Sequence, residues 1–533
     1  MFMEQHELIS AEFTRRRFIK GAGAAAVAVG VMGTSTGIAS AAKVAAPKKG
    51  GTLKLGVVGG ANDVFDAQYI VAKADQARTL STFESLMTFD TKFAPQTKHG
   101  LAESAKAVNP SKYVVKIRKG VKFHDGTPLT SADVVASFQR LLDPAQKTTG
   151  KPLRTFLNNA SVVATDANTV EFNLLIPNVD FIAVLAGYTY TIAKKGYDGK
   201  TQIGTSAYKL DSYTPGREST HSRFDGYWDK TEQYLDKVQI IDFADKTALV
   251  NALVAKQIDA AIDIPFEQWQ TIKSKKYLTA VENSAGAWLA MCMRIDIKPF
   301  DDNNVRQALR LIVNRKQMVK QVLNGHGKIA NDLYGYIDEF YNANNFPQRE
   351  QDIPAAVALL KKSGYSKANP LKVELTAPDD TGGLVLMIQA FAEMAKKTDG
   401  VVVVDAKVID GGTYWSAKGQ YMNTGFYTTY WSPRAYLAQV AASMDVYPEL
   451  KWPPAGSTFR ADYEKAVGIN NKEKRKVVVA KMQKEEFEKG GYIIPFFNNF
   501  ADAYSTKLQG VDTGPSQLNM GYYGHGFKGW YLA

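Results

Sequence analysis

The chain contains little of what stabilises small secreted scaffolds or builds metal sites. Its 533 residues include one cysteine, Cys292, and six histidines. A single cysteine excludes an intramolecular disulfide framework. Because no histidines are paired at the spacing of metal ligands, we expect no metal site and no other cofactor. Hydrophobic residues make up 45% of the chain and aromatic residues 11%, which indicates a globular protein of two or three domains with sizeable cores.

The first 41 residues resemble an export signal. Thr14–Lys20 is similar to a twin-arginine motif, a Gly/Ala-rich apolar segment follows it, and Ala39–Ala41 has the small residues of a cleavage site. A transmembrane anchor is the competing interpretation, but residues 21–42 are barely long enough and their composition inserts weakly. We predict a twin-arginine signal peptide cleaved near Ala41 and a mature protein free in the periplasm.

The chain also lacks signals of nucleic-acid binding and of common enzymes. The net charge is +12, but 65 basic residues are scattered among 53 acidic ones. Arg15–Arg17 is the one basic run of nucleic-acid type. After residue 41 there is no G-x-S-x-G elbow, H-E-x-x-H helix, P-loop or dinucleotide fingerprint. We expect no nucleic-acid partner and no enzymatic activity. A secreted hydrolase of peptide-like substrates is the alternative function.

The most informative stretch is YVVKIRKGVKFHDGTPLTSADVVASFQRLLDP, residues 113–144. Its first residues alternate with the period of a half-buried strand. Asp125-Gly126 is a turn pair, and Thr130 precedes Asp133 at the spacing of a helix capping box. Apolar residues then recur at helical spacing until Asp143-Pro144 ends the pattern. The stretch therefore predicts a strand, a turn and a capped helix.

The segment KIRKGVKFHDGTPLTSADVVASF within this stretch resembles the hallmark of family 5 extracellular solute-binding proteins. That family captures peptides, nickel chelates and other solutes for ABC importers. Further segments resemble the family in the same order along the chain, among them 50–53, 82–90, 222–230 and 301–309. The resemblance implies an α/β fold of the two-lobed periplasmic binding protein (Venus-flytrap) type, with an additional inserted subdomain in the first lobe.

The domain boundaries expected from this resemblance place both ends of the mature chain in one lobe. Lobe I takes residues 42–290, including the subdomain at about 85–200. Lobe II takes residues 291–500, and residues 501–533 return to lobe I.

Within the middle block, the apolar spacing predicts a helix from Val305 that closes at Gly325. Residues 371–376, 384–397 and 401–408 read as a strand, a helix and a strand, the unit of a parallel sheet.

The run 425–437 is the best candidate for ligand contact. It resembles a family segment whose acidic residue, in peptide binders, pairs with the amino terminus of the peptide. Here Ser432-Pro433-Arg434 occupies that place, so the acid is missing and a cation stands nearby. A buried ammonium group needs a paired carboxylate, whereas the planar guanidinium of Arg434 suits a carboxylate or phosphate.

Aromatic residues around Arg434 offer flat apolar surface with polar tips, the usual lining of a small-molecule site. An alternative interpretation makes Arg434 a surface or hinge ion-pair residue and places the aromatic side chains in the core. The expected ligand-binding residues are Trp431, Arg434, Tyr430, Tyr427, Trp415, Trp288 and Arg294, the last in place of an asparagine of the family.

The sequence thus predicts a periplasmic receptor that closes two lobes around one solute and delivers it to an inner-membrane ABC permease. The solute is either a peptide held by other acids or a carboxylate-bearing molecule such as an opine or a modified amino acid. A nickel chelate is a further option, although nothing else in the sequence supports it. We expect the receptor to be a monomer.

Overall fold

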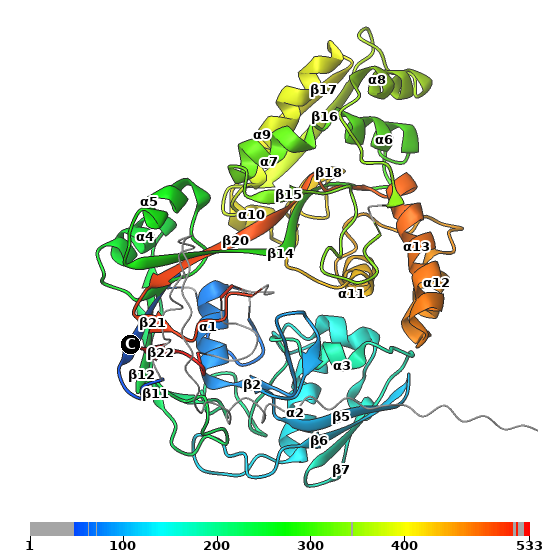
Figure 1. Ribbon diagram of the computed structural model, residues 1–533. Helices are drawn as coiled ribbons and strands as arrows, with labels where there is room; N and C mark the ends of the chain where they lie inside the picture. Colours follow the sequence, from blue (N-terminus) through cyan, green and yellow to red (C-terminus); the bar gives the residue numbers. More distant parts are fainter. Residues whose placement is uncertain (1–46, 62, 71, 343–344, 515–518, 521–526) are drawn as a thin grey trace, which may run out of the picture. The chain divides into compact units, whose positions relative to one another are not determined.

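A mixed β-sheet runs through the chain and joins its N-terminal and C-terminal halves (Figure 1). The computed structural model describes residues 47–533 except 62, 71, 343–344, 515–518 and 521–526. Residues 47–533 form one compact unit. The signal peptide predicted over residues 1–41 lies outside the described residues. No helix in the described part is long and apolar enough to cross a membrane.

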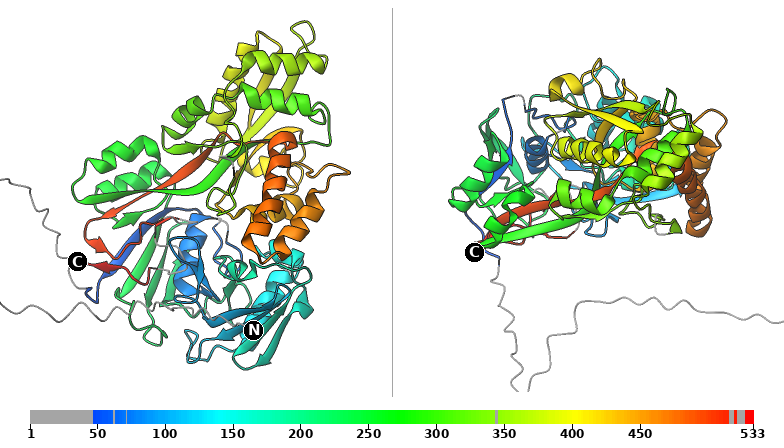
Figure 2. Two further views of the ribbon diagram at one scale, coloured as in Figure 1. Left: turned by 45° about the vertical axis from the view of Figure 1, so that its right-hand side comes forward. Right: turned by 90° about the horizontal axis from the view of Figure 1, so that it is seen from above.

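Two long strands form the middle of this 12-stranded sheet. β14 (Leu278–Met293) and β20 (Phe496–Ser505) pair antiparallel, with Trp288 opposite Phe497. They are the long green and red arrows in Figures 1 and 2. Because β14 comes from the middle of the chain and β20 from near its end, the pair ties together segments that are distant in sequence.

On the far side of β20 the sheet consists of strands from the N-terminal half. β1 (Thr52–Val58) alternates along its length, so that Leu53, Leu55 and Val57 are buried. β1 pairs in parallel with its two neighbours in the sheet, β12 and β13. The elements of this region are α1 (Lys73–Thr82), β10 (Tyr208–Thr214), β11 (Glu218–Arg223), β12 (Lys237–Phe243), α4 (Lys246–Val254), β13 (Ala260–Ala261) and α5 (Trp269–Lys273).

A separate antiparallel sheet contains the stretch predicted as strand, turn and capped helix. Its order is β5 (Ala102–Asn109), β6 (Lys112–Ile117), β8 (Thr169–Asn173) and β7 (Val162–Asp166), and α2 (Ser131–Leu142) and α3 (Phe181–Val184) pack with it. The predicted alternation is confirmed, because Tyr113, Val115 and Ile117 are buried. The capping box is confirmed too: the backbone N–H of Thr130 donates to Asp133 Oδ2 over 2.8 Å.

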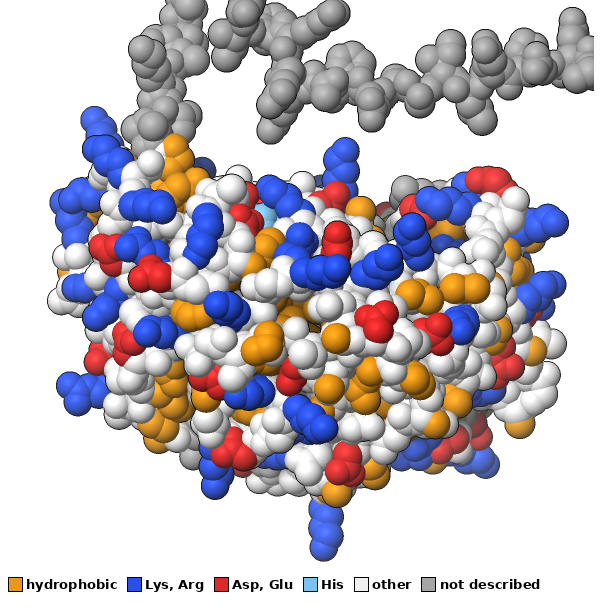
Figure 3. All heavy atoms as spheres, turned by 90° about the horizontal axis from the view of Figure 1, so that it is seen from below, with side chains coloured by type: hydrophobic (Ala, Val, Ile, Leu, Met, Phe, Trp, Pro, Cys, Tyr) orange, Lys and Arg blue, Asp and Glu red, His pale blue; other side chains and the backbone are white. Residues whose placement is uncertain are grey.

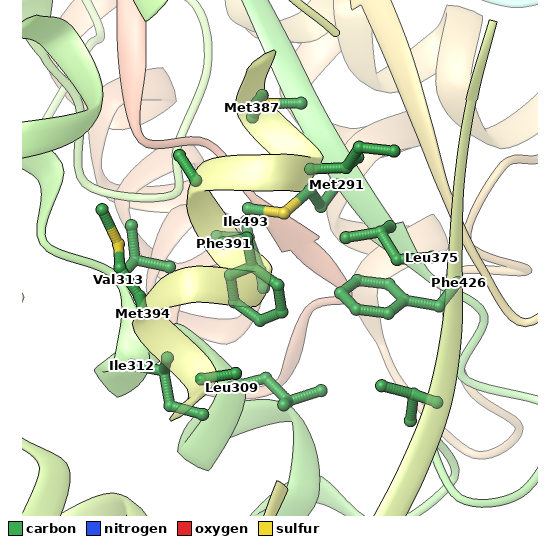
Figure 4. Close-up of a cluster of buried hydrophobic side chains, with 14 of the residues drawn as sticks. Met291, Leu309, Ile312, Val313, Leu375, Met387, Phe391, Met394, Phe426 and Ile493 are labelled. Atoms are coloured by element: carbon green, nitrogen blue, oxygen red, sulfur yellow. The ribbon is translucent and has the colours of Figure 1, made fainter. Parts of the chain in front are cut away.

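On the far side of β14 the sheet continues with β18 (Phe426–Trp431), β16 (Leu371–Pro378) and β17 (Val402–Ile409). β16 and β17 run in parallel and are connected by α9 (Leu384–Ala395), which confirms the predicted strand–helix–strand unit. The core beneath this helix is drawn in Figure 4, where Phe391 points toward Phe426. Their ring centroids lie 5.7 Å apart.

The helix predicted from Val305 to Gly325 is instead two helices, α6 (Asn303–Ile312) and α7 (Arg315–Leu323). The chain turns extended at Val313, and the side chain of Asn314 accepts the backbone N–H of Gln317 over 2.9 Å. Asparagine competes with the helix for backbone hydrogen bonds and so favours a new N-cap. The prediction of one continuous helix was wrong for this reason.

Three further helices follow β18: α11 (Tyr436–Ala441), α12 (Phe459–Gly468) and α13 (Lys472–Lys489). The segments around them touch the N-terminal half at places away from the large sheet. Arg475 Nη1 lies 2.8 Å from Asp180 Oδ2, and Lys151 donates to the carbonyl of Val446 over 2.7 Å. The remaining helices and strands are β2 (Glu84–Ser85), β3 (Thr88–Phe89), β4 (Pro95–Gln96), β9 (Thr191–Ile192), β15 (Gly327–Ile329), α8 (Ile353–Lys362), α10 (Gly411–Tyr414), β19 (Tyr492–Ile493), β21 (Leu508–Gln509) and β22 (Tyr531–Leu532).

Candidate functional site

A stack of four aromatic rings lies beside the run that the sequence singles out. Trp431 on β18 is directly opposite Trp288 on β14, and their ring centroids are 6.1 Å apart. Trp288 lies 5.7 Å from Tyr334, which in turn lies 5.4 Å from Tyr436. The interplanar angles are 27°, 12° and 21°. Rings packed face to face in this way give a rigid wall with little conformational freedom.

One face of β18 is directed at the buried Glu449, because side chains alternate along a strand. The Tyr427 hydroxyl donates to the Glu449 backbone carbonyl over 2.5 Å. Thr429 donates to the Glu449 carboxylate over 2.5 Å, and the Trp431 indole N–H does so over 3.0 Å. Tyr430 points away from this face and is 48% exposed.

The Glu449 carboxylate is fully buried and has four hydrogen-bond donors. Oε1 accepts from Tyr421 (2.7 Å) and Thr429, and Oε2 accepts from Trp431 and Tyr492 (2.5 Å). Burial raises the pKa of Glu449, and the hydrogen bonds from these donors partly lower it again. Among the described residues, no cationic side chain forms a salt bridge with it.

Arg434 lies against the outer ring of the stack. Its guanidinium carbon is 4.8 Å from the centroid of the Trp431 ring, a cation–π distance. Within the described structure, Arg434 Nη1 is buried and has no hydrogen-bond partner. A buried donor without an acceptor is costly. The group is therefore suited to an acceptor that comes from outside the chain.

Two tyrosines of the N-terminal half lie within electrostatic reach of Arg434. Burial raises the pKa of Tyr188, and the Arg434 charge partly opposes that rise. Burial raises the pKa of Tyr190 to about 12, again against the Arg434 charge. Tyr188 also forms a hydrogen bond with Gln76 of α1. The Arg434 charge thus lies near the loop that follows α3.

The other predicted residues have different surroundings. Tyr427 and Trp288 have 0% and 1% of their surface exposed, so they support the wall and present no surface of their own. Trp415 packs edge-on against Tyr430 with centroids 5.6 Å apart, and its indole N–H donates to Asp380. Arg294 forms a bidentate pair with Asp296 and donates to the Met422 carbonyl, away from Arg434.

Several participants were missed in the sequence. Glu449 was overlooked, although a carboxylate between Val446 and Leu450 in an apolar context is a sign of a buried acid. The other residues missed were Gln76, Tyr188, Tyr190, Tyr334, Tyr436 and Tyr492.

One group in the described structure has the residue types of a metal site. The ligand atoms of His99, Asp229 and Glu232 all lie within 4.8 Å of one another. However, Lys98 forms a salt bridge with Glu232 over 3.1 Å. Burial and the charges of Lys528, Lys98 and Arg118 lower the pKa of His99 to about 3. Positive surroundings of this kind oppose the binding of a further cation.

The described structure also has a cavity whose arginine is already paired. A cavity of about 540 Å³ is lined by Gln68, Arg140 and Tyr197. There Arg140 is held by Asp66 over 2.6 Å and by Gln68 over 3.1 Å. On the face drawn in Figure 3, basic side chains are interspersed with acidic ones and form no continuous track. Arg434, unlike Arg140, has a buried nitrogen without a partner in the described structure, which makes it a candidate for an incoming anion.

Comparison with known proteins identifies the fold and family. The glutathione-binding protein GsiB of Escherichia coli (strain K12) is 29% identical over 311 residues, which are 57% of this chain and 59% of that relative. The chain thus matches less than two thirds of the length of this relative. The PBP AgaA of A. tumefaciens R10, solved with agropinic acid, superposes with a TM-score of 0.76 at 21% identity, over 91% of this chain and 99% of AgaA.

The periplasmic binding protein DppA of Helicobacter pylori, solved with the peptide STSA, has a TM-score of 0.76 at 18% identity, over 91% of this chain and 98% of DppA. These similarities confirm the predicted fold class. The model of the bacterial extracellular solute-binding proteins, family 5 Middle, matches residues 96–447, more than half of the chain. The chain belongs to the family 5 bacterial extracellular solute-binding proteins.

Proposed function

We propose that the chain is the solute-binding receptor of an ABC importer and that it holds a peptide-like, carboxylate-bearing solute against Arg434. The observation that carries the proposal is the buried Nη1 of Arg434, which has no partner in the described structure. A carboxylate would supply charge and acceptors in the geometry that a guanidinium favours.

The relatives support this class of solute. GsiB is named for glutathione, AgaA was solved with agropinic acid and DppA with a peptide. Each of these molecules carries at least one carboxylate. The position of Arg434 distinguishes this chain from peptide binders that hold an ammonium group there, so the carboxylate end of the solute is the end we assign to it.

The proposed site has two walls. Trp431 forms the wall next to Arg434, and the exposed Tyr430 lies on the other face of β18. Tyr188 and Tyr190 form the wall on the N-terminal half. We assign Tyr427, Trp288 and Trp415 to the support of the first wall, and we place Arg294 outside the site because Asp296 already pairs with it.

We further propose that lobe I (42–290 and 501–533) and lobe II (291–500) close around the solute, with β14 and β20 as the connection between them. Contacts from both walls would favour the closed state by binding it more tightly than the open one. The closed receptor then delivers the solute to an inner-membrane ABC permease. We propose a monomer in the periplasm, exported by the twin-arginine route.

The test is to identify the solute that the protein itself retains. Freshly purified protein is denatured, and the released small molecules are analysed by mass spectrometry. We expect a carboxylate-bearing molecule of peptide-like size in wild-type protein and its loss from Arg434→Ala. Arg294→Ala is the matched control and should retain it. A retained solute without any acidic group would contradict the proposal.

A further inference from the structure

We propose that Glu449 is the positioning residue of the anion site: through the indole N–H of Trp431 it holds the ring against which Arg434 lies, so that the guanidinium stays in place without an ion-pair partner among the described residues. This inference rests on the proposed function of Arg434. It assigns a role to a residue that does not touch the solute.

The hydrogen bonds at Glu449 fix the Trp431 ring from its edge. The indole N–H of Trp431 can only donate a hydrogen bond, so Glu449 Oε2, 3.0 Å away, acts as its acceptor. The same oxygen accepts from Tyr492, and the other accepts from Tyr421 and Thr429. Four donors around two oxygens fill the acceptor capacity of an ionised carboxylate.

A carboxylate at this edge also changes what the ring offers to a cation. Hydrogen bonds in a buried network polarise one another, and an indole that donates to a negative group has a more electron-rich face. The attraction between this face and the Arg434 guanidinium, 4.8 Å away, is strengthened accordingly.

The arrangement explains how a binding-site arginine can be ordered and still have a free donor. An aspartate or glutamate beside Arg434 would hold it equally well but would occupy the N–H groups that a solute needs, as Asp296 does at Arg294. The contact with Trp431 holds the guanidinium through the ring and does not occupy the N–H groups of its buried Nη1. In its ionised form, Glu449 supplies negative charge from behind the ring without competing for the donors.

The test observes Arg434 directly and does not depend on the identity of the solute. The guanidinium carbon of Arg434 is assigned in a 13C-detected spectrum of the solute-free chain by its absence from Arg434→Lys. The Trp431 ring current should displace this signal from the other arginines. In Glu449→Gln, which keeps the shape and removes the charge, we expect at least half of that displacement to be lost.

Asp502→Asn is the matched control. Asp502 is also a fully buried carboxylate with several donors, Asn519, Met520 and the backbone of Asp263, but it is not bonded to Trp431. The Arg434 signal should keep its position in this variant. An unchanged Arg434 signal in Glu449→Gln, or an equal change in Asp502→Asn, would overturn the proposal.

Two further measurements keep the test decisive. If Glu449→Gln does not fold, Trp431→Phe removes the N–H while keeping a ring, and the Arg434 signal should lose its displacement in the same way. Calorimetry with glutathione as the probe should give about tenfold weaker binding in Glu449→Gln. If wild-type protein binds no glutathione, that result counts against the proposed solute class, and the Arg434 signal still decides the role of Glu449.

Discussion

Arg434 lies over the ring of Trp431, with the guanidinium carbon 4.8 Å from the ring centroid, and one of its terminal nitrogens is buried without a partner in the described structure. This contact with the ring leaves the buried Nη1 of the guanidinium available to an outside acceptor. It occupies the segment in which the family resemblance leads one to expect an acid. In the proposed site, this relationship would favour an anionic group of the solute over a cationic one.

The first prediction concerns Arg434 itself. Arg434→Ala should weaken binding of the retained solute by about tenfold or more, because a charge-assisted pair to a carboxylate is lost. The thermal midpoint of the solute-free protein should stay nearly unchanged, since the guanidinium forms no salt bridge with a described residue. Titration calorimetry and scanning calorimetry measure the two quantities.

Arg294→Ala serves as the control for loss of a cation. Its guanidinium is engaged by Asp296 and the Met422 carbonyl, so binding should stay within about twofold of wild type. Equal affinity in Arg434→Ala and wild type would remove Arg434 from the site.

The second prediction concerns the opposite wall. Tyr190→Phe and Tyr188→Phe each remove one hydroxyl near the Arg434 charge and keep the ring. We expect each to weaken binding by about two- to tenfold, the effect of one neutral hydrogen bond. Tyr365→Phe, in the core region of β16 and α9, is the control and should bind like wild type. Affinities that match wild type in both variants would show that this wall does not touch the solute.

Local patterns in the sequence were sufficient for several elements. The alternation of β6, the cap at Thr130 and the β16–α9–β17 unit depend on neighbours a few residues apart, so their signals are complete within one short stretch. The break at Asn314 was missed because the apolar spacing continues across it, while the cap depends on one side chain turning back onto the backbone.

The candidate site was only partly predictable, because it combines residues that are distant in the sequence. Trp431 and Arg434 could be proposed together because they lie in one run of the chain. Side chains alternate along a strand, so the sequence of β18 also predicts that Tyr427, Thr429 and Trp431 share one face and that Tyr430 lies on the other. That prediction was not made. Glu449 and Tyr190 reach the site only through tertiary packing, which leaves no periodic signal in the sequence.

The third prediction tests the core that supports β18. Phe426 is 1% exposed and packs between Phe300 and Phe391, with ring centroids 5.3 and 5.7 Å away. Phe426→Ala should cost about 3–5 kcal/mol of stability, because the lost burial and the cavity add together. Val403→Ala on β17, where the side chain is 45% exposed, should cost less than about 1 kcal/mol. Urea unfolding curves compare the two, and similar midpoints would contradict the assigned packing.

The fourth prediction concerns Glu486, a buried carboxylate that accepts the hydroxyls of Tyr334 and Tyr436. Burial raises its pKa from 4.5 to about 7 in the folded protein. Between these values the folded state binds more protons than the unfolded state, so stability from this group is present at low pH and is lost as pH rises through about 7. Glu486→Gln cannot ionise, and the pH dependence should therefore flatten.

Relative to wild type, Glu486→Gln should gain stability as the pH increases from 4.5 to 8, by up to about 3 kcal/mol for a change of this size in pKa. Chemical unfolding across this pH range measures the difference. Glu473→Gln, an exposed position on the same helix, should give a pH profile parallel to that of wild type. If Glu486→Gln instead loses stability relative to wild type with rising pH, the carboxylate is ionised and stabilising in the folded protein, and the raised pKa is wrong.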